Sequence, residues 1–369
     1  MKIFMQTPKV FSVSKEYTFD HMSYSGFLHN EIGVLDYLKH GYLSSSLYAK
    51  LCNPNYIQKL YQEKNPGYMA YLAEFYTRFH DFDVIVMNPG VDLVHPEFLI
   101  SHFPNALKCL HFIDDPHMTY SYCFPFSWAF DCATYITPSY SEEYTMPEIL
   151  SNAGFKHKKW FPHCITNNLP PRYSVEELSH QLWQREKKAI YVGNFYTSKV
   201  KRLIKIKSEL GDTLDIFGRH PFGGLPFPLM STLTGYPSLY RVQELQESRR
   251  EEFYSSYAIG LNMHLSDPAR ETGNARLYEL AYRGVAQVVD SSECSAVRNI
   301  FTPEKEILLY ENLRECIAQV KRLQNDDKFR VSLALNAYIR ATKEYSYETV
   351  LTETCDWFKT LLAHKSNNT

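Results

Sequence analysis

The sequence predicts an α/β protein made of two doubly wound domains, and three observations support this prediction. Short apolar runs bounded by turn residues recur along the whole chain. Segments with the apolar spacing of helices lie between these runs. The alternation stops once, in a polar stretch with a Pro-Pro pair at residues 163–188. Runs that are apolar on both faces are typical of parallel strands covered by helices, and their alternation with helices implies right-handed crossovers.

The length of the chain fits this organisation. With 369 residues, of which 44% are apolar, the chain is too long for one compact core and suits two domains of ordinary size. We place the linker in the polar stretch. We therefore predict an N-terminal Rossmann-like domain over residues 1–165, a C-terminal Rossmann-like domain over residues 187–345, and a helical segment over residues 346–369.

In the first half, a helix is expected over residues 26–41, because the apolar residues from Phe27 to Leu38 follow helical spacing and Gly41 ends the segment. Strands are expected at "KIFM" (2–5), "DVIVMNPG" (83–90), "LKCLHFIDD" (107–115) and "ATYITPS" (133–139).

In the second half, the same pattern restarts after residue 187. Strands are expected at "KAIYVGN" (188–194), "TLDIFGR" (213–219), "AIGLNMH" (258–264), "VAQVVDSS" (285–292) and "EILLYEN" (306–312), and helices at 197–212, 312–326 and 343–365. Ligands of open parallel sheets bind beyond the carboxyl ends of the strands. The polar residues at these ends, Gly193, Asn194, Arg219 and His264, are therefore expected at one edge.

Composition excludes several classes of protein. The net charge is only −2, so binding of nucleic acid by bulk charge is not expected. The eight cysteines are scattered without a C-x-x-C pair, which favours reduced thiols over a disulfide framework or a zinc site. No run approaches the roughly 20 apolar residues of a membrane span, and no signal pattern is present. We expect a cytoplasmic protein without a transmembrane segment.

The segment "ARETGNARLYELAYRGVAQVVD", residues 269–290, carries the most informative pattern. A helix is expected to begin near Gly273 or Asn274. The unpaired N–H groups and the positive end of the dipole at a helix start form an anion site. Gly273 lets a phosphate approach the backbone, and Arg276 in the first turn adds a forked cation.

Two glutamates flank this helix start. Glu271 precedes the helix, and Glu279 lies about one and a half turns into it. A carboxylate at the second position can accept both hydroxyls of a ribose. Together they suggest a nucleoside diphosphate that carries a hydroxylated group, such as a sugar, beside Glu271. The alternative interpretation makes Glu271 a partner of the helix dipole and Glu279 part of a solvated helix face.

The order of motifs resembles a known family. The series "AIYVGNFYTSKVKRL", "LDIFGRH", "YSSYAIGLNMHLSD", "GNARLYELAYRGVAQVVD" and "EYSYETVLTE" is similar to the CgeB-type glycosyltransferases, named for spore-maturation proteins, and more widely to GT-B glycosyltransferases. The resemblance covers roughly residues 187–360. Upstream, "LHFIDDPH", "FDCATYITPS" and "WFPHCI" look like landmarks of the family's first domain.

This resemblance implies a GT-B fold and a nucleotide-sugar donor of the UDP- or GDP-sugar type, with no cofactor and no metal. It also implies that the segment 346–369 crosses back to the first domain. The E-x₇-E spacing of Glu271 and Glu279 is that of many retaining GT-B enzymes, in which the first Glu contacts the donor sugar and the second the ribose. Those enzymes usually have a Gly-Phe-Gly-like loop, whereas this chain has "TGNAR". We favour retention over inversion on the spacing.

Further candidates lie on both sides of the expected cleft. Lys199 or Arg202 can neutralise the leaving group, or can belong to the basic face of an exposed helix with Lys201. Arg219 and His264 are candidates for base or phosphate contact.

In the first domain, Asp115 and His117 can bind or deprotonate an acceptor hydroxyl, or can belong to an Asx-Pro turn. Tyr24, Ser25 and Gly26 are candidates for the acceptor side.

We therefore expect a glycosyltransferase that moves a sugar from a nucleotide sugar to a glycan, protein, lipid or nucleic acid. Two alternatives stay open. A nucleotide-sugar epimerase shares the fold and would turn over without an acceptor. A surface or assembly protein would keep the fold without catalysis.

Overall fold

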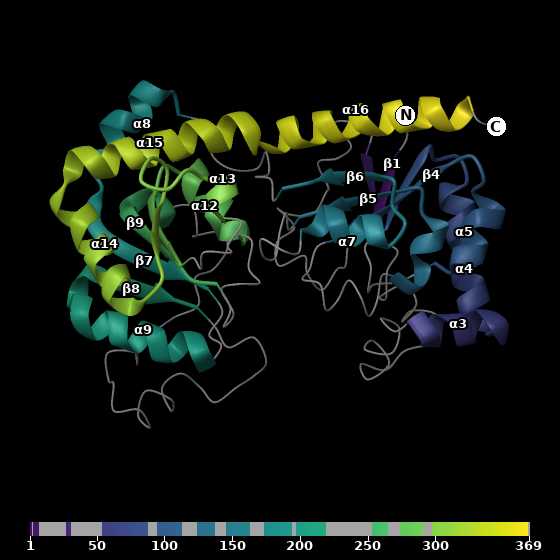
Figure 1. Ribbon diagram of the computed structural model, residues 1–369, viewed down its shortest axis with the longest axis horizontal. Coiled ribbons are helices and arrows are strands. Elements are labelled where there is room, and N and C mark those ends of the chain that lie inside the picture. The colour runs from purple at the N-terminus through teal and green to yellow at the C-terminus, as the bar shows by residue number, and fades with distance from the viewer. Residues whose placement is uncertain are drawn as a thin grey trace.

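The computed structural model describes residues 1, 3–6, 27–30, 54–87, 94–112, 124–136, 145–162, 173–193, 197–218, 253–264, 274–290 and 297–367. These residues form two lobes, each built around one parallel sheet (Figure 1). Two consecutive helices at the end of the chain run along one side of both lobes (Figure 1).

The first sheet has six parallel strands in the order β2-β1-β3-β4-β5-β6. The strands are β1 (Ile3–Gln6), β2 (Phe27–Asn30), β3 (Val84–Met87), β4 (Leu107–Phe112), β5 (Cys132–Tyr135) and β6 (His157–Trp160). The helix expected over residues 26–41 is wrong at its start, because Phe27–Asn30 is a strand that pairs with β1. Parallel pairing with β1 outweighs the helical spacing of this short segment.

Five helical segments accompany this sheet: α3 (Pro54–Gln62), α4 (Pro66–Phe79), α5 (Pro96–His102), the 3₁₀ helix η3 (Phe124–Ala129) and α7 (Met146–Asn152). Local sequence explains where several begin. Asn65 caps α4, whose first residue is a proline, and Thr145 forms a capping box with Glu148 at α7.

The second sheet has five parallel strands in the order β11-β10-β9-β7-β8. The strands are β7 (Glu186–Val192), β8 (Leu214–Phe217), β9 (Tyr257–Asn262), β10 (Ala286–Asp290) and β11 (Leu308–Tyr310). All five lie within the segments that the sequence predicts as strands, apart from the first residues of β7 and β9. Strand β10 is buried throughout, as expected for a parallel strand covered on both faces.

The helical segments of the second lobe are α8 (Val175–Leu182), α9 (Thr197–Leu210), the 3₁₀ helix η4 (Gly211–Thr213), α12 (Ala275–Tyr282), α13 (Val297–Ile300), α14 (Leu313–Asn325) and α15 (Asp327–Glu344). Helix α12 packs very closely on the central strand. A Cβ at Gly260 of β9 would lie 2.7 Å from Leu280 of α12, so glycine permits this approach.

The last helix, α16 (Tyr347–Ser366), packs against the first sheet. Its buried residues Val350, Leu351, Cys355, Phe358 and Leu361 form one cluster with residues of β3, β4 and β5. The sequence predicts one helix from residue 343, but Ser346 caps a new helix there. Helix α15 ends at Glu344 in the second lobe, so the pair bridges both lobes (Figure 1).

An aromatic cluster lies where the two helices meet. Tyr345, between α15 and α16, makes edge contacts with Tyr278 of α12 at 5.1 Å and with Trp160 of β6 at 6.0 Å between ring centroids. The Tyr345 hydroxyl donates to the carbonyl of Ile300. Tyr345 therefore links α12 of the second lobe to the last strand of the first sheet.

Candidate functional site

Polar residues meet at the carboxyl edge of the second sheet. Gly193 follows β7, Gly218 follows β8, His264 lies two residues beyond β9, and Asp290 ends β10. Because the strands are parallel neighbours, these positions share one edge. This is the edge at which open α/β sheets bind ligands.

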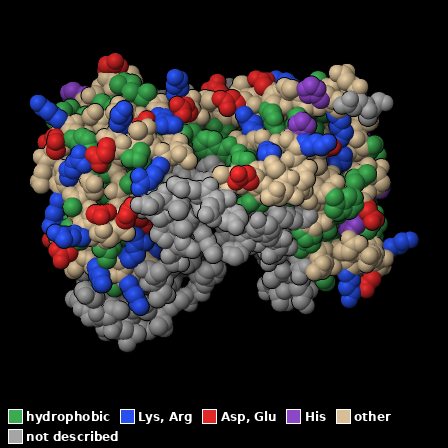
Figure 2. All heavy atoms as spheres, viewed as in Figure 1, with side chains coloured by type: hydrophobic (Ala, Val, Ile, Leu, Met, Phe, Trp, Pro, Cys, Tyr) green, Lys and Arg blue, Asp and Glu red, His purple; other side chains and the backbone are tan. Residues whose placement is uncertain are grey.

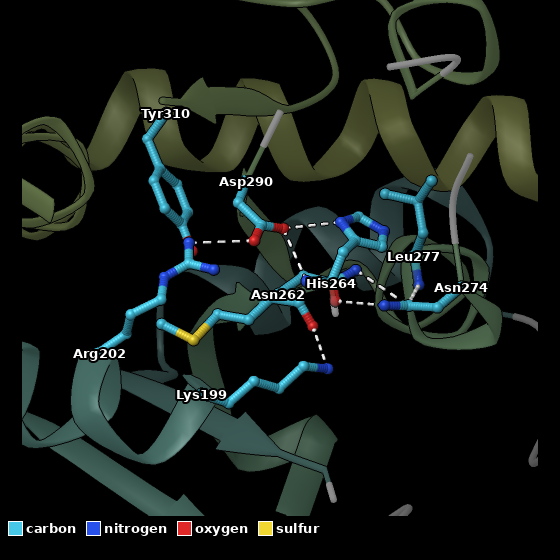
Figure 3. Close-up of polar contacts among 9 residues, drawn as sticks. Lys199, Arg202, Asn262, His264, Asn274, Leu277, Asp290 and Tyr310 are labelled. Atoms are coloured by element: carbon cyan, nitrogen blue, oxygen red, sulfur yellow. Dashed lines mark hydrogen bonds and ion pairs between the residues drawn. The ribbon is translucent and has the colours of Figure 1, made fainter. Parts of the chain in front are cut away.

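The helix predicted near Gly273 or Asn274 begins at Ala275, with Asn274 as its N-cap. The Asn274 side chain accepts from the Leu277 N–H at 3.2 Å. It also exchanges two amide hydrogen bonds with Asn262 of β9, at 2.9 and 3.2 Å (Figure 3). The Asn274 amide is thus committed to the cap and the strand, so an anion here would contact backbone N–H groups.

Arg276, in the first turn of α12, lies directly on Gly193. A Cβ at Gly193 would lie 3.0 and 3.1 Å from the two terminal guanidinium nitrogens of Arg276 and 2.9 Å from the Tyr191 hydroxyl. The guanidinium also lies over the Tyr191 ring, 5.7 Å from its centroid. The Arg276 Nε is buried and has no hydrogen-bond partner among the described residues. Two residues predicted for nucleotide-sugar binding, 83 positions apart, are therefore in contact.

Lys199 reaches the same edge from the first turn of α9. Its side chain is buried, and its Nζ donates to the carbonyl of Met263 at 3.0 Å (Figure 3). The alternative that places Lys199 on an exposed basic face is wrong. Lys201 is exposed, and Arg202 pairs with Asp290 at 3.1 Å.

Asp290 is the centre of a buried polar network. One carboxylate oxygen accepts from the His264 backbone N–H at 2.8 Å and lies 2.7 Å from His264 Nδ1; the other accepts from Arg202 (Figure 3). Burial alone would raise the pKa of Asp290, but the hydrogen bonds from His264 and the charge of Arg202 hold it below its ordinary value. The carboxyl group is therefore ionised at neutral pH.

Glu279 is buried, with 5% of its surface exposed. The alternative that places it on a solvated helix face is therefore wrong. Every residue of α12 from Leu277 to Tyr282 is buried. A carboxylate in this position is costly unless it is paired or serves a ligand.

Several predicted site residues lie outside the described residues. They are Tyr24, Ser25, Gly26, Asp115, His117, Asn194, Arg219, Glu271 and Gly273. Their roles stay predictions. The described part of the site contains Gly193, Lys199, His264, Asn274, Arg276 and Glu279, and the first five of these lie at or contact the carboxyl edge.

Sequence reasoning missed three residues of this site. Asp290 ends a strand at the same edge as His264, and that position was a usable signal. Asn262 and Tyr191 lie within apolar strands, and only the fold shows that one holds Asn274 and the other supports Arg276.

The described residues on the face shown in Figure 2 carry no dominant charge. Figure 2 shows acidic and basic side chains interspersed over the visible face, in keeping with the net charge of −2. Among the described residues, no group of three or more His, Cys, Asp or Glu side chains could hold a metal ion. Within the same residues, no helix is long and apolar enough to span a membrane.

Comparisons with known proteins agree with this architecture. The family model described as glycosyl transferase-like matches residues 200–356. The crystal structure of Alr3699/HepE from Anabaena in complex with UDP has a TM-score of 0.62 at 13% sequence identity, and the similarity covers 98% of this chain and 100% of that chain. No curated protein matches.

Two further structures show the same arrangement. Sucrose-phosphate synthase from Thermosynechococcus elongatus has a TM-score of 0.56 at 13% identity, covering 83% of this chain and 80% of that chain. An alpha-glucosyltransferase in complex with UDP-glucose and DNA containing an abasic site has a TM-score of 0.54 at 10% identity, covering 78% and 83%. The two parallel sheets and these similarities define a GT-B fold, which confirms the predicted fold class.

Proposed function

We propose that the protein is a glycosyltransferase that uses a nucleotide sugar. One observation carries the proposal: three elements bring anion-binding groups to one edge of the second sheet. Helix α12 supplies its N-terminus and Arg276, α9 supplies Lys199, and β7 supplies Gly193, which leaves room for the guanidinium. Cations, free N–H groups and a glycine together suit a diphosphate.

The donor is proposed to bind the second domain, residues 187–345. The diphosphate would lie at the start of α12, near Gly273, Arg276 and Lys199, and Glu279 would hold the ribose. Glu271 would contact the sugar, with Asn194 and Arg219 near the base or phosphates. The complexes of structurally similar proteins with UDP and UDP-glucose support UDP over GDP.

The acceptor is proposed to bind the first domain, residues 1–165. Asp115 and His117 would orient the acceptor hydroxyl, and Tyr24, Ser25 and Gly26 would line its side of the cleft. The acceptor is a glycan, protein, lipid or nucleic acid. We also propose that the enzyme belongs to the CgeB type and acts in the cytoplasm.

Retention and metal independence complete the proposal. Arg276, Lys199 and the α12 dipole would stabilise the departing diphosphate, so transfer would not need a divalent ion. The diphosphate oxygens, held on the side where the acceptor attacks, could take the proton of the acceptor hydroxyl. Proton NMR of the first-formed product would show the donor's anomeric configuration; the opposite configuration would refute retention.

Calorimetry tests the donor site directly. UDP should bind the wild-type protein in the presence of chelator and bind more tightly than GDP. Arg276→Ala should weaken UDP binding about tenfold or more, because it removes charge-assisted hydrogen bonds. The control is Arg298→Ala, since Arg298 lies exposed on α13 and pairs with Glu311. Equal behaviour of the two variants would contradict the assigned site.

Substitutions of the two glutamates should have different effects on binding in the same assay. Glu279→Ala should weaken UDP binding by about 1.5–3 kcal/mol, whereas Glu271→Ala should mainly weaken binding of the nucleotide sugar. Equal losses of UDP affinity would contradict the division of roles. Conversion of a nucleotide sugar to its epimer without acceptor would favour the epimerase instead.

A further inference from the structure

The imidazole of His264 is held in one orientation by Asp290, which Arg202 holds from its other side. Its Nδ1 lies 2.7 Å from the Asp290 carboxylate on the neighbouring strand, and its own backbone N–H binds the same oxygen at 2.8 Å. Arg202 holds the other carboxylate oxygen, so Asp290 cannot turn away without losing this pair (Figure 3). Figure 3 shows Arg202 and His264 on opposite sides of Asp290.

This arrangement fixes the tautomer of the ring. An ionised carboxylate only accepts hydrogen bonds, so Nδ1 must carry the hydrogen. In the neutral ring, Nε2 then presents a lone pair and can only accept. The described residues leave Nε2 without any hydrogen-bond partner, although His264 is only 2% exposed. Buried polar atoms without partners are rare, and each calls for an explanation.

The surroundings of His264 belong to the proposed donor site. Met263, the preceding residue, receives the hydrogen bond of Lys199, and Asn262 holds the N-cap of α12. A diphosphate offers only acceptor oxygens and cannot satisfy a lone pair. Hydroxyl groups are donors and can do so. Because Glu279 is proposed to hold the ribose hydroxyls, the hydroxyl groups of the transferred sugar are the donors left for His264.

We propose that His264 Nε2 accepts a hydrogen bond from a hydroxyl group of the transferred sugar, with Asp290 fixing the ring for this contact. The inference rests on the proposed function and deepens it, because it makes His264 a residue that distinguishes one sugar from another. Arg202 acts only through Asp290, as a positioning residue.

The test compares a nucleotide with its sugar esters. His264→Asn places an amide N–H close to the position of Nδ1, where it can still donate to Asp290, but it removes Nε2. Affinities for UDP and for the best bound of UDP-glucose, UDP-galactose and UDP-N-acetylglucosamine are measured by calorimetry. His264→Asn should weaken the sugar ester about threefold to tenfold and leave UDP within twofold. Unchanged affinity for both, or an equal loss for both, would overturn the proposal.

A second buried histidine provides the matched control. His111 lies in β4 of the first sheet, with its Nδ1 2.8 Å from Thr134 Oγ1. His111→Asn should affect stability but not the ratio of the two affinities; a shift in this ratio as large as that of His264→Asn would overturn the proposal.

Deoxy analogues identify the hydroxyl. The wild-type protein should lose affinity for one of the 2-, 3-, 4- and 6-deoxy sugar esters, and His264→Asn should lose nothing further on that analogue. Full additivity for all four would contradict the contact. Failure of the wild-type protein to bind UDP or any of the sugar esters would refute the proposed function itself, whereas wild-type binding of a sugar ester that His264→Asn leaves unchanged relative to UDP would refute only the present inference.

Discussion

Gly193 shows how one missing side chain shapes the site. Its φ is not in the left-handed region, so the backbone would tolerate alanine, but the added methyl would meet the Tyr191 hydroxyl at 2.9 Å and the Arg276 guanidinium at 3.0 Å. Gly193→Ala should therefore displace Arg276 and weaken UDP binding about tenfold, with little loss of stability. Calorimetry and thermal unfolding measure the two effects.

Gly154→Ala is the matched control. Gly154 has a φ of +92°, and an added methyl would meet nothing within 4 Å, so alanine there strains the backbone and costs about 1 kcal/mol of stability. UDP binding should not change. If Gly193→Ala behaves in the same way, the contact with Arg276 does not matter for binding.

Lys108 is a buried ammonium at the start of β4. Burial, and then the charge of Lys365, lower its pKa to about 8, against the attraction of Asp131. Below about pH 8, Lys108 is protonated in both the folded and the unfolded protein, and its buried charge destabilises the fold fully. As pH increases from about 8 towards the unfolded pKa of 10.5, the folded protein loses this charge first, so stability should rise. Lys108 donates to the Ala106 carbonyl and pairs with Asp131. Lys365 donates to the same two groups, so both acceptors keep a partner without Lys108.

Lys108→Met should consequently stabilise the protein at pH 7 by up to about 3 kcal/mol. The advantage should shrink as pH rises through the window between 8 and 10.5. Denaturant unfolding at several pH values measures it, with Lys59→Met on the exposed face of α3 as the control. A destabilised Lys108→Met variant at pH 7 would contradict this explanation.

Among the elements, α12 depends on its cap more than an ordinary helix does. Asn274→Ala removes the cap, which costs about 1 kcal/mol. It also leaves the buried amide of Asn262 without the hydrogen bond that it donates to Asn274 and the one that it accepts from Asn274, which adds about 1–3 kcal/mol. Because the helix start would lose its connection to β9, UDP binding should weaken as well.

Asn312→Ala offers the comparison, since Asn312 caps α14 through the Glu315 N–H on an exposed surface. It should cost about 1 kcal/mol and leave UDP binding unchanged. Equal stability losses for the two variants would show that the pair with Asn262 contributes nothing.

Much of the second sheet could be predicted from the sequence, because a parallel strand buried on both faces is a continuous apolar run that few other structures explain. The strand Phe27–Asn30 could not, because its partner β1 lies more than 20 positions away and local spacing favours a helix. The same limit applies to the site. The start of α12 follows from local residues, but the contact between Gly193 and Arg276 and the burial of Glu279 depend on long-range packing.

At the scale of the whole molecule, helix α16 stabilises the first sheet. Phe358 of α16 is 1% exposed and packs in the cluster with β3, β4 and β5. Phe358→Ala should cost about 3–5 kcal/mol. Amide exchange should accelerate in β3 to β5 before it does in β7 to β10, because the lost contacts belong to the first sheet. Thr360→Ala, exposed on the same helix, is the control, and uniform acceleration across both sheets would contradict a local effect.

Because α16 covers the first sheet, the order of synthesis on the ribosome matters. Strands β1 to β6 emerge first, but the helix that covers one face of their sheet emerges only after the whole second lobe. At roughly 5–20 residues per second, the stretch from Trp160 to Tyr347 takes on the order of 10–40 s to synthesise. During that interval the second lobe can fold, while Val84, Val86 and Leu107 still lack their cover from α16. We therefore expect the nascent first lobe to expose this apolar face of its sheet until α16 has left the exit tunnel.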